Sequence, residues 1–370
     1  MTKFHILCIR FSSLGDIILH SSVMSAIKKR WGDKVHISLL TSEAFAPLME
    51  DHPDIDSVYK FSRKKSLAQL FKLFRSINQQ RSIDLILDLH GTLRSLALRF
   101  RFMNIPRLSV DKRTLERSLL TTFKIDLLSG QNKYFDEREK SFGELLLLRN
   151  IRDFAEVFDL EMEREENRLS SNAWTFKDDP TLWKRLGLDF LNEAKYMVIC
   201  PSASFPEKRW DSNKFKEVIE KLCQDENWQE YYFVILAGAQ DDFCKVFNEL
   251  GSKYQTEKGS RVINLQGKTN LVESALLSKH AKLAFGNDTG LPHIAESMGT
   301  PALFILGPTG QQFGFYPHLR LSKTIFADKL WCRPCTTNGK GRCIRFERYC
   351  LTGISVERVY EELNELKDHL

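Results

Sequence analysis

The stretch that most constrains the fold spans residues 283–310 and reads LAFGNDTGLPHIAESMGTPALFILGPTG. It predicts a short apolar strand, a Gly-rich turn at 286–290, and a helix with Pro292 in its first turn. A buried strand over residues 301–306 follows and ends in a second Gly-rich turn. Parallel strands of an open α/β sheet place their carboxyl ends at one edge, where ligands bind. The two turns should therefore meet at such an edge.

This stretch has two interpretations. A helix N-terminus with free N–H groups beside small residues suits an anion, typically a phosphate. Asp288 and His293 would add titratable groups at its mouth. Alternatively, the segment is an ordinary strand, turn and helix with an Asp/Thr cap, which is a common arrangement. One Gly-rich turn does not decide between them.

The N-terminus predicts a βαβ unit of the same plan. A strand at 4–11, a turn at 12–16, a helix at 17–31 and a strand at 35–40 follow one another. The unit lacks the G-x-G-x-x-G dinucleotide fingerprint, which argues against an NAD- or FAD-dependent enzyme. Asp16 lies where this first strand gives way to the helix. A catalytic base and a helix-capping Asp would both occupy that position.

The fold class expected from these units is α/β, with two doubly wound domains in a chain of 370 residues. The predicted divisions are an N-terminal domain at 1–172, a C-terminal domain at 173–352 and a terminal helix at 353–370 that packs back on the N-terminal domain. In the second half, each Gly- or Ser-rich turn follows a predicted strand, so the turns should converge on one rim. Lys208 follows the first of them and is well placed to meet a phosphate.

Basic residues gather in two parts of the first half. Arg63, Lys64 and Lys65 open a predicted helix, a placement that opposes the helix dipole and slightly favours an anion site. A basic segment with interleaved apolar residues covers 103–145 and suits an anionic membrane surface. The net charge of +6 fits an acidic partner without identifying one. No nucleic-acid module is recognisable, so nucleic acid is not an expected partner.

The N-terminal sequence MTKFHILCIRF has no signal-peptide pattern, and no apolar run approaches the roughly 20 residues of a membrane span. A cytoplasmic protein with mostly reduced thiols is expected. Four cysteines form a C-x2-C-x7-C-x6-C pattern that resembles a structural zinc site, although the spacing is not that of the common fingers. Packed thiols or a labile disulfide are the alternatives. These four are Cys332, Cys335, Cys343 and Cys350.

Several segments together resemble glycosyltransferase family 9, the ADP-heptose:lipopolysaccharide heptosyltransferases. They are ILCIRFSSLGDIILHSSVMSAIKKRW at 6–31, DLILDLHGTLRS at 84–95, PSASFPEKRW at 201–210 and GNDTGLPHIAESMGTPALFILGPT at 286–309. The tail CLTGISVERV at 350–359 is similar to that of the second-heptose enzymes. The resemblance implies the GT-B architecture, two Rossmann-like domains facing across a cleft. It also implies an inverting transfer of a heptose to the lipopolysaccharide inner core, with no metal or other cofactor required.

The resemblance assigns roles to individual residues. Asp16 matches the proposed general base, and Lys208 matches the lysine on the donor diphosphate. The resemblance assigns the remaining donor contacts to Ser202, Ser204, Gly238, Gln240, Asp288, Thr289, Gly290 and His293. It assigns the acceptor contacts to Ser13, Gly15, Arg63, Lys64, Lys65 and Arg94. The implied partners are the nucleotide-sugar ADP-heptose, an anionic glycolipid, and the cytoplasmic face of the inner membrane, contacted peripherally.

One departure leaves the nucleotide contact open. Gln240 occupies a position where some members carry an acidic residue for the ribose, and Asp241 or Asp242 would have to substitute. The alternatives to the heptosyltransferase are a same-fold transferase with another nucleotide-sugar or acceptor, and a catalytically silent nucleotide- or glycolipid-binding homologue. The presence of both Asp16 and Lys208 argues against the silent homologue.

Overall fold

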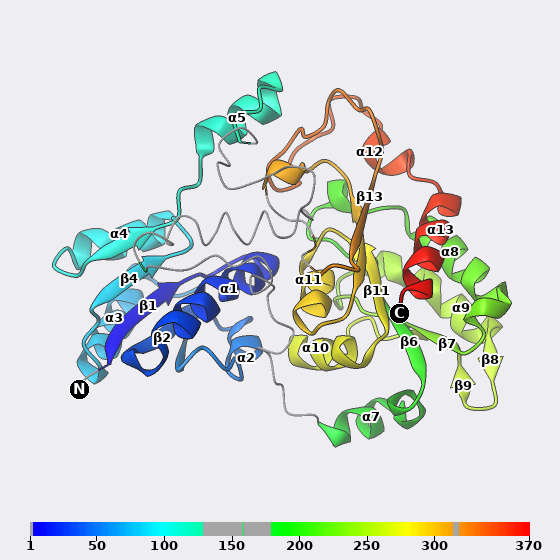
Figure 1. The fold of residues 1–370 in the computed structure, drawn as a ribbon, viewed down its shortest axis with the longest axis horizontal. Helices are drawn as coiled ribbons and strands as arrows, with labels where there is room; N and C mark the ends of the chain where they lie inside the picture. The colour runs from blue at the N-terminus through cyan, green and yellow to red at the C-terminus, as the bar shows by residue number, and fades with distance from the viewer. Residues whose placement is uncertain (1–2, 129–157, 159–178, 314–316, 318) are drawn as a thin grey trace. The chain divides into compact units, whose positions relative to one another are not determined.

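The computed structural model describes residues 3–128, 158, 179–313, 317 and 319–370 (Figure 1). The chain divides into two compact units. Unit 1 comprises residues 1–113 and 147–176, and unit 2 comprises residues 114–146 and 177–370. The predicted boundary at 172/173 and the charged linker lie outside the described residues, as do residues 129–145 of the basic segment.

Unit 1 is built on a five-stranded parallel sheet in the order β3-β2-β1-β4-β5. Its strands are β1 (Phe4–Ile9), β2 (Val35–Ser42), β3 (Ser57–Phe61), β4 (Leu85–Asp88) and β5 (Arg107–Ser109). The connecting helices are α1 (Leu14–Trp31), α2 (Ala46–Met49), α3 (Leu67–Gln80) and α4 (Leu93–Arg101). Because the strand order reverses between β1 and β4, the loops after these two strands border a topological switch point.

Unit 2 repeats the plan with a six-stranded parallel sheet in the order β10-β7-β6-β11-β12-β13. Its strands are β6 (Lys195–Cys200), β7 (Tyr231–Ile235), β10 (Val262–Asn264), β11 (Leu283–Asn287), β12 (Ala302–Leu306) and β13 (Lys323–Phe326). A separate antiparallel pair joins β8 (Gln255–Thr256) and β9 (Gly259–Ser260). The helices are α5 (Thr114–Phe123), α7 (Pro180–Leu186), α8 (Ser212–Gln224), α9 (Asn248–Lys253), α10 (Leu271–His280), α11 (Gly290–Ser297), α12 (Tyr349–Thr352) and α13 (Val356–Asp368). The switch point lies between β6 and β11.

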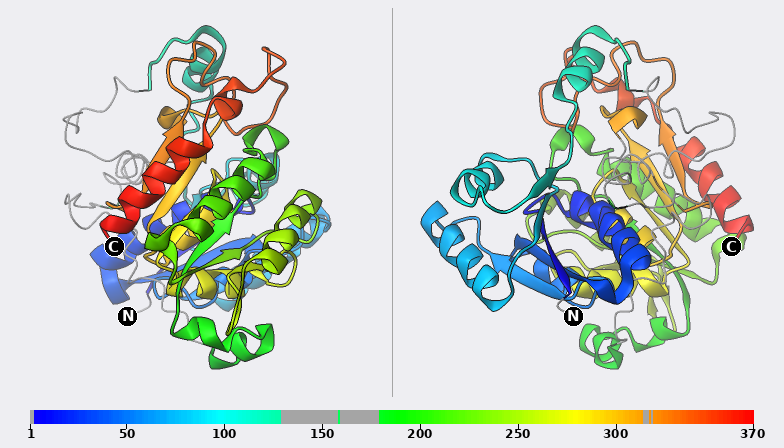
Figure 2. Two further views of the ribbon diagram at one scale, coloured as in Figure 1. Left: turned by 90° about the vertical axis from the view of Figure 1, so that its right-hand side faces the viewer. Right: turned by 60° about the vertical axis from the view of Figure 1, so that its left-hand side comes forward.

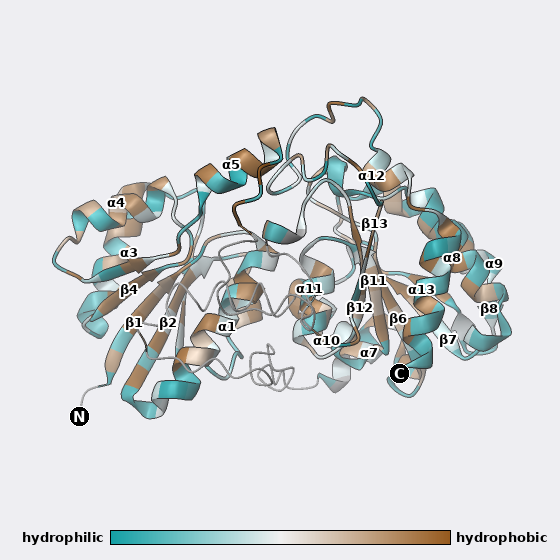
Figure 3. Cartoon of the chain, turned by 45° about the horizontal axis from the view of Figure 1, so that its top comes forward, coloured by the Kyte–Doolittle hydropathy of each residue, from teal (hydrophilic) through white to brown (hydrophobic). Residues whose placement is uncertain are grey.

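Both sheets carry the apolar runs that predicted them, and Figure 3 shows hydrophobic residues concentrated on the strands. Strands β6 and β11 approach so closely that a Cβ on Gly286 would lie 2.4 Å from the Cys200 carbonyl oxygen. Only glycine fits at that point. The two doubly wound sheets confirm the predicted α/β class. Among the described residues, no helix is both long and apolar enough to cross a membrane.

The prediction that the terminal helix packs back on the N-terminal domain is wrong, because the buried face of this helix packs on unit 2. Helix α13 runs beside α8 of unit 2 (Figure 2). Val359, Leu363 and Leu366 on that face belong to the same core as Leu222 and Trp228. Their helical spacing gives one apolar stripe, which is buried against the nearest apolar surface of its own unit.

The described part of residues 114–146 also departs from the predicted division, because it clusters with unit 2. The ammonium of Lys124 donates to the carbonyl oxygens of Cys332, at 2.9 Å, and Pro334, at 2.6 Å. Leu120 and Leu128 form a small buried cluster with Phe313. These contacts join residues about two hundred positions apart, so local patterns could not reveal them.

Acid should destabilise unit 1 through His52, which is buried in the turn after α2. Burial lowers the pKa of His52 to about 3, below the roughly 6.5 of an unfolded chain. The unfolded state therefore binds a proton more readily as the pH falls below about 6.5, and the free energy of unfolding should drop by about 2 kcal/mol between pH 6.5 and 5. Denaturant titrations of the parent and His52→Gln at both pH values measure this. Equal pH dependence in the two proteins would contradict the prediction.

Candidate active site

Asp16 lies in the first turn of α1, directly after the carboxyl end of β1. Its Oδ2 accepts from the backbone N–H of Ser13 at 3.0 Å and from the Ser13 hydroxyl at 2.7 Å. The same oxygen lies 2.5 Å from a guanidinium nitrogen of Arg10, and 21% of the Asp16 side chain is exposed. Burial alone would raise the pKa of Asp16, but Arg10, His20 and the hydrogen bonds from Ser13 outweigh it and hold the pKa at about 2. Asp16 is therefore a carboxylate at neutral pH.

Two histidines that the sequence analysis did not select lie beside Asp16. His20 Nδ1 is 2.6 Å from the Asp16 carbonyl oxygen, which only accepts, so Nδ1 carries the proton. His90 follows β4 across the switch point, and its Nε2 lies 3.3 Å from the Ser12 hydroxyl. Burial and the charge of Arg10 lower the pKa of both His20 and His90 to about 4, so both rings are neutral at pH 7. Arg10 lies at the carboxyl end of the strand predicted at 4–11, and His90 lies just past the carboxyl end of β4. A position at the carboxyl end of a strand is the sequence signal that could have identified them.

A cavity of about 840 Å³ opens beside this switch point in unit 1. Ser12 and His90 line it, and so do five basic residues: Arg63, Arg94, Arg99, Arg107 and Lys112. The buried carboxylate of Asp88 pairs with Arg107. The other four basic residues leave the cavity with an excess of positive charge, which suits an anionic ligand.

The predicted acceptor residues divide into three groups. Arg63 and Arg94 line the cavity, where Arg63 donates to the Phe11 carbonyl at 2.8 Å and Arg94 donates to the Arg63 carbonyl at 2.6 Å. Ser13 and Gly15 lie next to Asp16 in the turn and the first turn of α1. Lys64 and Lys65 do not line the cavity. Lys65 instead lies 3.4 Å from Glu43.

In unit 2, the two Gly-rich turns meet as predicted, and Lys208 lies between them. Its ammonium is 2.5 Å from Asp288 Oδ2, and the Thr309 hydroxyl donates to the same oxygen at 3.1 Å. His293 Nε2 lies 3.7 Å from the other carboxylate oxygen. Burial would raise the pKa of Asp288, but the Lys208 charge and His293 hold it well below its ordinary value. The sequence analysis missed Thr309, although it lies in the second of the two predicted turns.

Neighbouring loops complete this edge of the sheet. Asn287 donates to the Pro201 carbonyl at 2.6 Å and accepts from the Trp210 N–H at 3.0 Å, which ties the β6 loop to the β11 loop. Thr289 caps α11 without a side-chain hydrogen bond, and Gly290 is the first residue of that helix. The described residues thus place a helix N-terminus beside a partly buried lysine, a combination that suits a phosphate.

The outer loops hold the remaining predicted donor residues. Asp241 Oδ2 accepts from the Ser202 hydroxyl at 2.6 Å and from the Gly238 N–H at 2.8 Å. Ser204 and Gln240 are exposed. Asp242 pairs with Lys245 at 2.7 Å. Asp241 is therefore engaged within the protein, whereas Asp242 and the Gln240 amide are both exposed on this loop.

The four-cysteine loop packs against Lys208. Gly339, at φ +89°, lies so close that a Cβ on it would be 2.4 Å from Cγ and Cδ of Lys208. Arg333 donates to the Gly307 carbonyl at 2.8 Å, and the Cys335 N–H donates to that of Pro308 at 3.1 Å. The four cysteines are free thiols. Within the described ranges, no group of three or more His, Cys, Asp or Glu side chains is arranged to hold a metal ion.

Gly339→Ala should therefore displace the Lys208 side chain and weaken nucleotide-sugar binding about tenfold. Gly341→Ala is the matched control, because Gly341 also has a positive φ, +134°, but a Cβ added there would meet nothing within 4 Å. Both variants strain the backbone, and only the first touches Lys208. Calorimetric titration of both proteins checks this. Equal losses of affinity would show that backbone strain in the loop, and not Lys208, is responsible.

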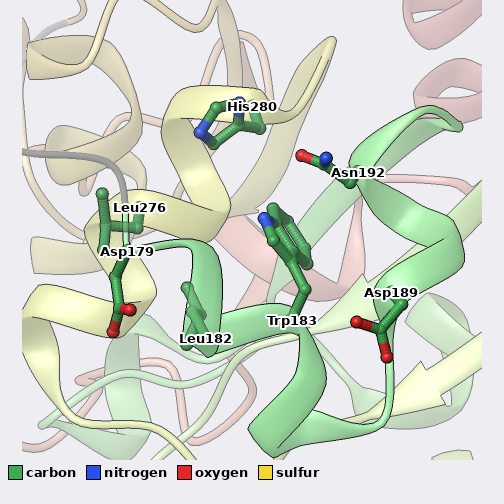
Figure 4. Close-up of a pocket in the computed structure, with 7 residues that line it drawn as sticks. All are labelled: Asp179, Leu182, Trp183, Asp189, Asn192, Leu276 and His280. Carbon is green, nitrogen blue, oxygen red and sulfur yellow. The ribbon is translucent and has the colours of Figure 1, made fainter.

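Unit 2 also has a cavity, which lies away from the edge of the sheet that holds Lys208. It has a volume of about 310 Å³ and is lined by Asp179, Leu182, Trp183, Asp189, Asn192, Leu276 and His280 (Figure 4). Trp183 and His280 face each other edge to face at 5.8 Å. Asn192 precedes β6 and His280 precedes β11, so this cavity lies toward the amino ends of the strands. Ligands of open α/β sheets bind at the carboxyl ends instead.

The comparisons with known proteins identify the family of the chain. The family model for glycosyltransferase family 9 (heptosyltransferase) matches residues 70–342. Lipopolysaccharide heptosyltransferase 3 of Escherichia coli is 27% identical over 307 residues, covering 81% of this chain and 82% of that protein. Lipopolysaccharide heptosyltransferase 2 of Escherichia coli K12 is 30% identical over 176 residues, 47% of each chain.

The structure of ADP-heptose lipopolysaccharide heptosyltransferase II of Escherichia coli is similar with a TM-score of 0.64 and 20% identity, over 99% of this chain and 98% of that one. At that identity the likeness shows the fold, which is that of the GT-B heptosyltransferases. The curated relatives include enzymes named heptosyltransferase 1, 2 and 3. They do not single out the second-heptose type.

Proposed function

The chain belongs to glycosyltransferase family 9, and from that premise we propose that it transfers a heptose from ADP-heptose to the lipopolysaccharide inner core. The observation that carries the proposal is the Lys208 ammonium, held 2.5 Å from Asp288 at the switch point of unit 2. A partly buried cation beside a helix N-terminus is suited to a diphosphate. The likeness to a protein named lipopolysaccharide heptosyltransferase 3, over 81% of this chain, supports the choice of sugar and acceptor.

The donor would bind at unit 2. Lys208 would contact the diphosphate, and the N–H groups of Thr289 and Gly290 would reach its oxygens from the start of α11. Asp288 and His293 would then orient Lys208 and the helix rather than hold the ligand, because both side chains are buried. Ser202, Ser204, Gly238 and Gln240 would face the nucleotide from the outer loops.

The acceptor would bind at the basic cavity of unit 1, with Asp16 as general base. The Asp16 carboxylate would take the proton from the acceptor hydroxyl as its oxygen bonds to the anomeric carbon of the heptose. The bond from that carbon to the ADP oxygen would break, giving inverted configuration, and Lys208 would stabilise the charge that develops on ADP. Because its pKa is about 2, Asp16 is a weak base. The proton should therefore move late, when bond formation has acidified the hydroxyl.

The proposed step requires no metal or organic cofactor, since Lys208 and the helix N–H groups would provide the positive charge. The acceptor would be an anionic glycolipid, recognised by Arg63 and Arg94 together with Arg99 and Lys112 of the cavity. We propose a cytoplasmic enzyme that associates peripherally with the membrane surface carrying that glycolipid, at the cytoplasmic face of the inner membrane.

A transferase with another nucleotide-sugar is the second candidate. Gln240 stands where some family members carry an acidic residue for the ribose, so this loop would contact the nucleotide differently from theirs.

Binding and turnover of ADP-heptose, UDP-glucose and GDP-mannose test the two candidates, with a truncated inner-core acceptor and EDTA present. The proposal predicts selective binding of ADP-heptose and ADP release that depends on the acceptor. Selective binding of another nucleotide-sugar would show that this compound, and not ADP-heptose, is the donor. Binding of none would favour the catalytically silent homologue.

A further inference from the structure

The solvent side of α4 carries four apolar side chains in a row. Leu93, Leu96, Phe100 and Met103 are 84%, 37%, 66% and 78% exposed. Their spacing of three, four and three residues places them on one side of the helix and of the turn that follows it. They are called the α4 stripe below. A contiguous exposed apolar patch of this kind marks an interaction surface, whereas single exposed apolar residues do not.

The opposite side of α4 already serves the core of unit 1. Leu98 is fully buried there, and Phe102 stacks on Phe74 with ring centroids 4.3 Å apart. The helix is therefore apolar on two opposite sides, which is typical of a helix covered on both. Figure 3 shows hydrophobic and hydrophilic residues alternating along α4.

Arginines border the α4 stripe. Arg99 and Arg101 are exposed, and Arg101 lies over the Phe102 ring at 5.6 Å. Within the part of the chain that the structure describes, neither has a carboxylate within ion-pair distance. An exposed apolar stripe with unneutralised arginines along it has the composition of an interfacial helix that enters an anionic lipid surface.

We propose that the α4 stripe docks unit 1 onto an anionic phospholipid membrane. Phe100 and Met103 would enter the acyl boundary, and Arg99 and Arg101 would contact the lipid phosphates. The stripe continues into the basic cavity, because Leu93 and Leu96 also line it. The role of this continuity rests on the proposed function, because docking would bring the cavity to the membrane surface in which a glycolipid acceptor is embedded.

Flotation of the full-length protein with vesicles tests this docking without any sugar substrate. Vesicles of equal parts phosphatidylglycerol and phosphatidylcholine should bind the parent protein, and pure phosphatidylcholine vesicles should bind it much less. Phe100→Ser/Met103→Ser should lower the partition coefficient on anionic vesicles about tenfold. Phe4→Ser/Leu67→Ser is the matched control, because these residues of the same unit are also exposed, at 46% and 44%, and should leave binding unchanged.

Arg99→Gln/Arg101→Gln should reduce binding to anionic vesicles and its salt dependence, with little effect on neutral vesicles. Unchanged thermal midpoints of the variants confirm that the fold is intact. Parent-like vesicle binding by Phe100→Ser/Met103→Ser would overturn the proposal, and so would a parent that binds no anionic vesicles. A stripe covered by a second copy of the chain would appear as a dimer that this variant dissociates, which would also overturn it. Turnover on a soluble acceptor reports on the proposed function separately.

Discussion

Asp16→Asn should lower turnover by about a thousandfold and leave the nucleotide-sugar Kd within about twofold of the parent value. The amide keeps the size of the side chain but cannot take the proton of the acceptor hydroxyl. Nucleotide-sugar affinity should be kept, because the proposed donor contacts all lie in unit 2. Single-turnover rates and calorimetric titration of the same preparation separate the two quantities.

Asp33→Asn is the control for this substitution. Asp33 is an exposed carboxylate of the same unit and pairs with Lys3 on the surface, at 3.0 Å, so its variant should turn over normally. Near-normal turnover of Asp16→Asn would show that Asp16 is not the base. His90 would then be the next residue to test, because it lines the cavity and is neutral at pH 7.

Lys208→Ala should weaken nucleotide-sugar binding at least tenfold and lower turnover about a hundredfold, because the charge that develops on ADP loses its nearest cation. It should also destabilise unit 2, by about 3–5 kcal/mol, because it leaves the buried Asp288 carboxylate without its partner. Asp288 is almost fully buried. Binding, turnover and denaturant unfolding are the three measurements.

A double variant separates the role of Lys208 in the fold from its role in the reaction. Lys208→Ala/Asp288→Asn removes both charges of the pair, so it should recover most of the lost stability while turnover stays low. Recovery of turnover along with stability would show that Lys208 acts only by neutralising Asp288. Lys208 would then have no direct part in stabilising the leaving group.

Local sequence patterns were enough to predict the strands of this protein and the turns that follow them. The Ser-rich turn after β6 and the Gly-rich turns after β11 and β12 could be predicted from the sequence, because Gly, Pro and Ser mark tight turns after apolar runs. Asp288 and Lys208 were then expected at one edge of a parallel sheet, and their ammonium-to-carboxylate distance of 2.5 Å agrees. The helices that start after these turns follow from the same reasoning.

The contacts that position the side chains of the site could not be predicted, because most of them join distant parts of the chain. Gly339 packs on Lys208 from a loop more than a hundred residues later, and Lys124 crosses to the four-cysteine loop. Arg10 is close to Asp16 in sequence, but their pairing depends on the path of the turn between them. Of the basic triplet, Arg63 lines the cavity and Lys64 and Lys65 do not, because neighbouring side chains in a turn point in different directions.

The most direct test of the central claim is the product formed from ADP-heptose and a truncated inner-core acceptor. Mass spectrometry and NMR spectroscopy of that product are the measurements. Family membership, Lys208 in unit 2 and Asp16 in unit 1 predict an acceptor heavier by one heptose, one ADP released per transfer, and a glycosidic bond of inverted anomeric configuration. Retained configuration would contradict the single displacement with Asp16 as base, and an unmodified acceptor would contradict the heptosyltransferase itself.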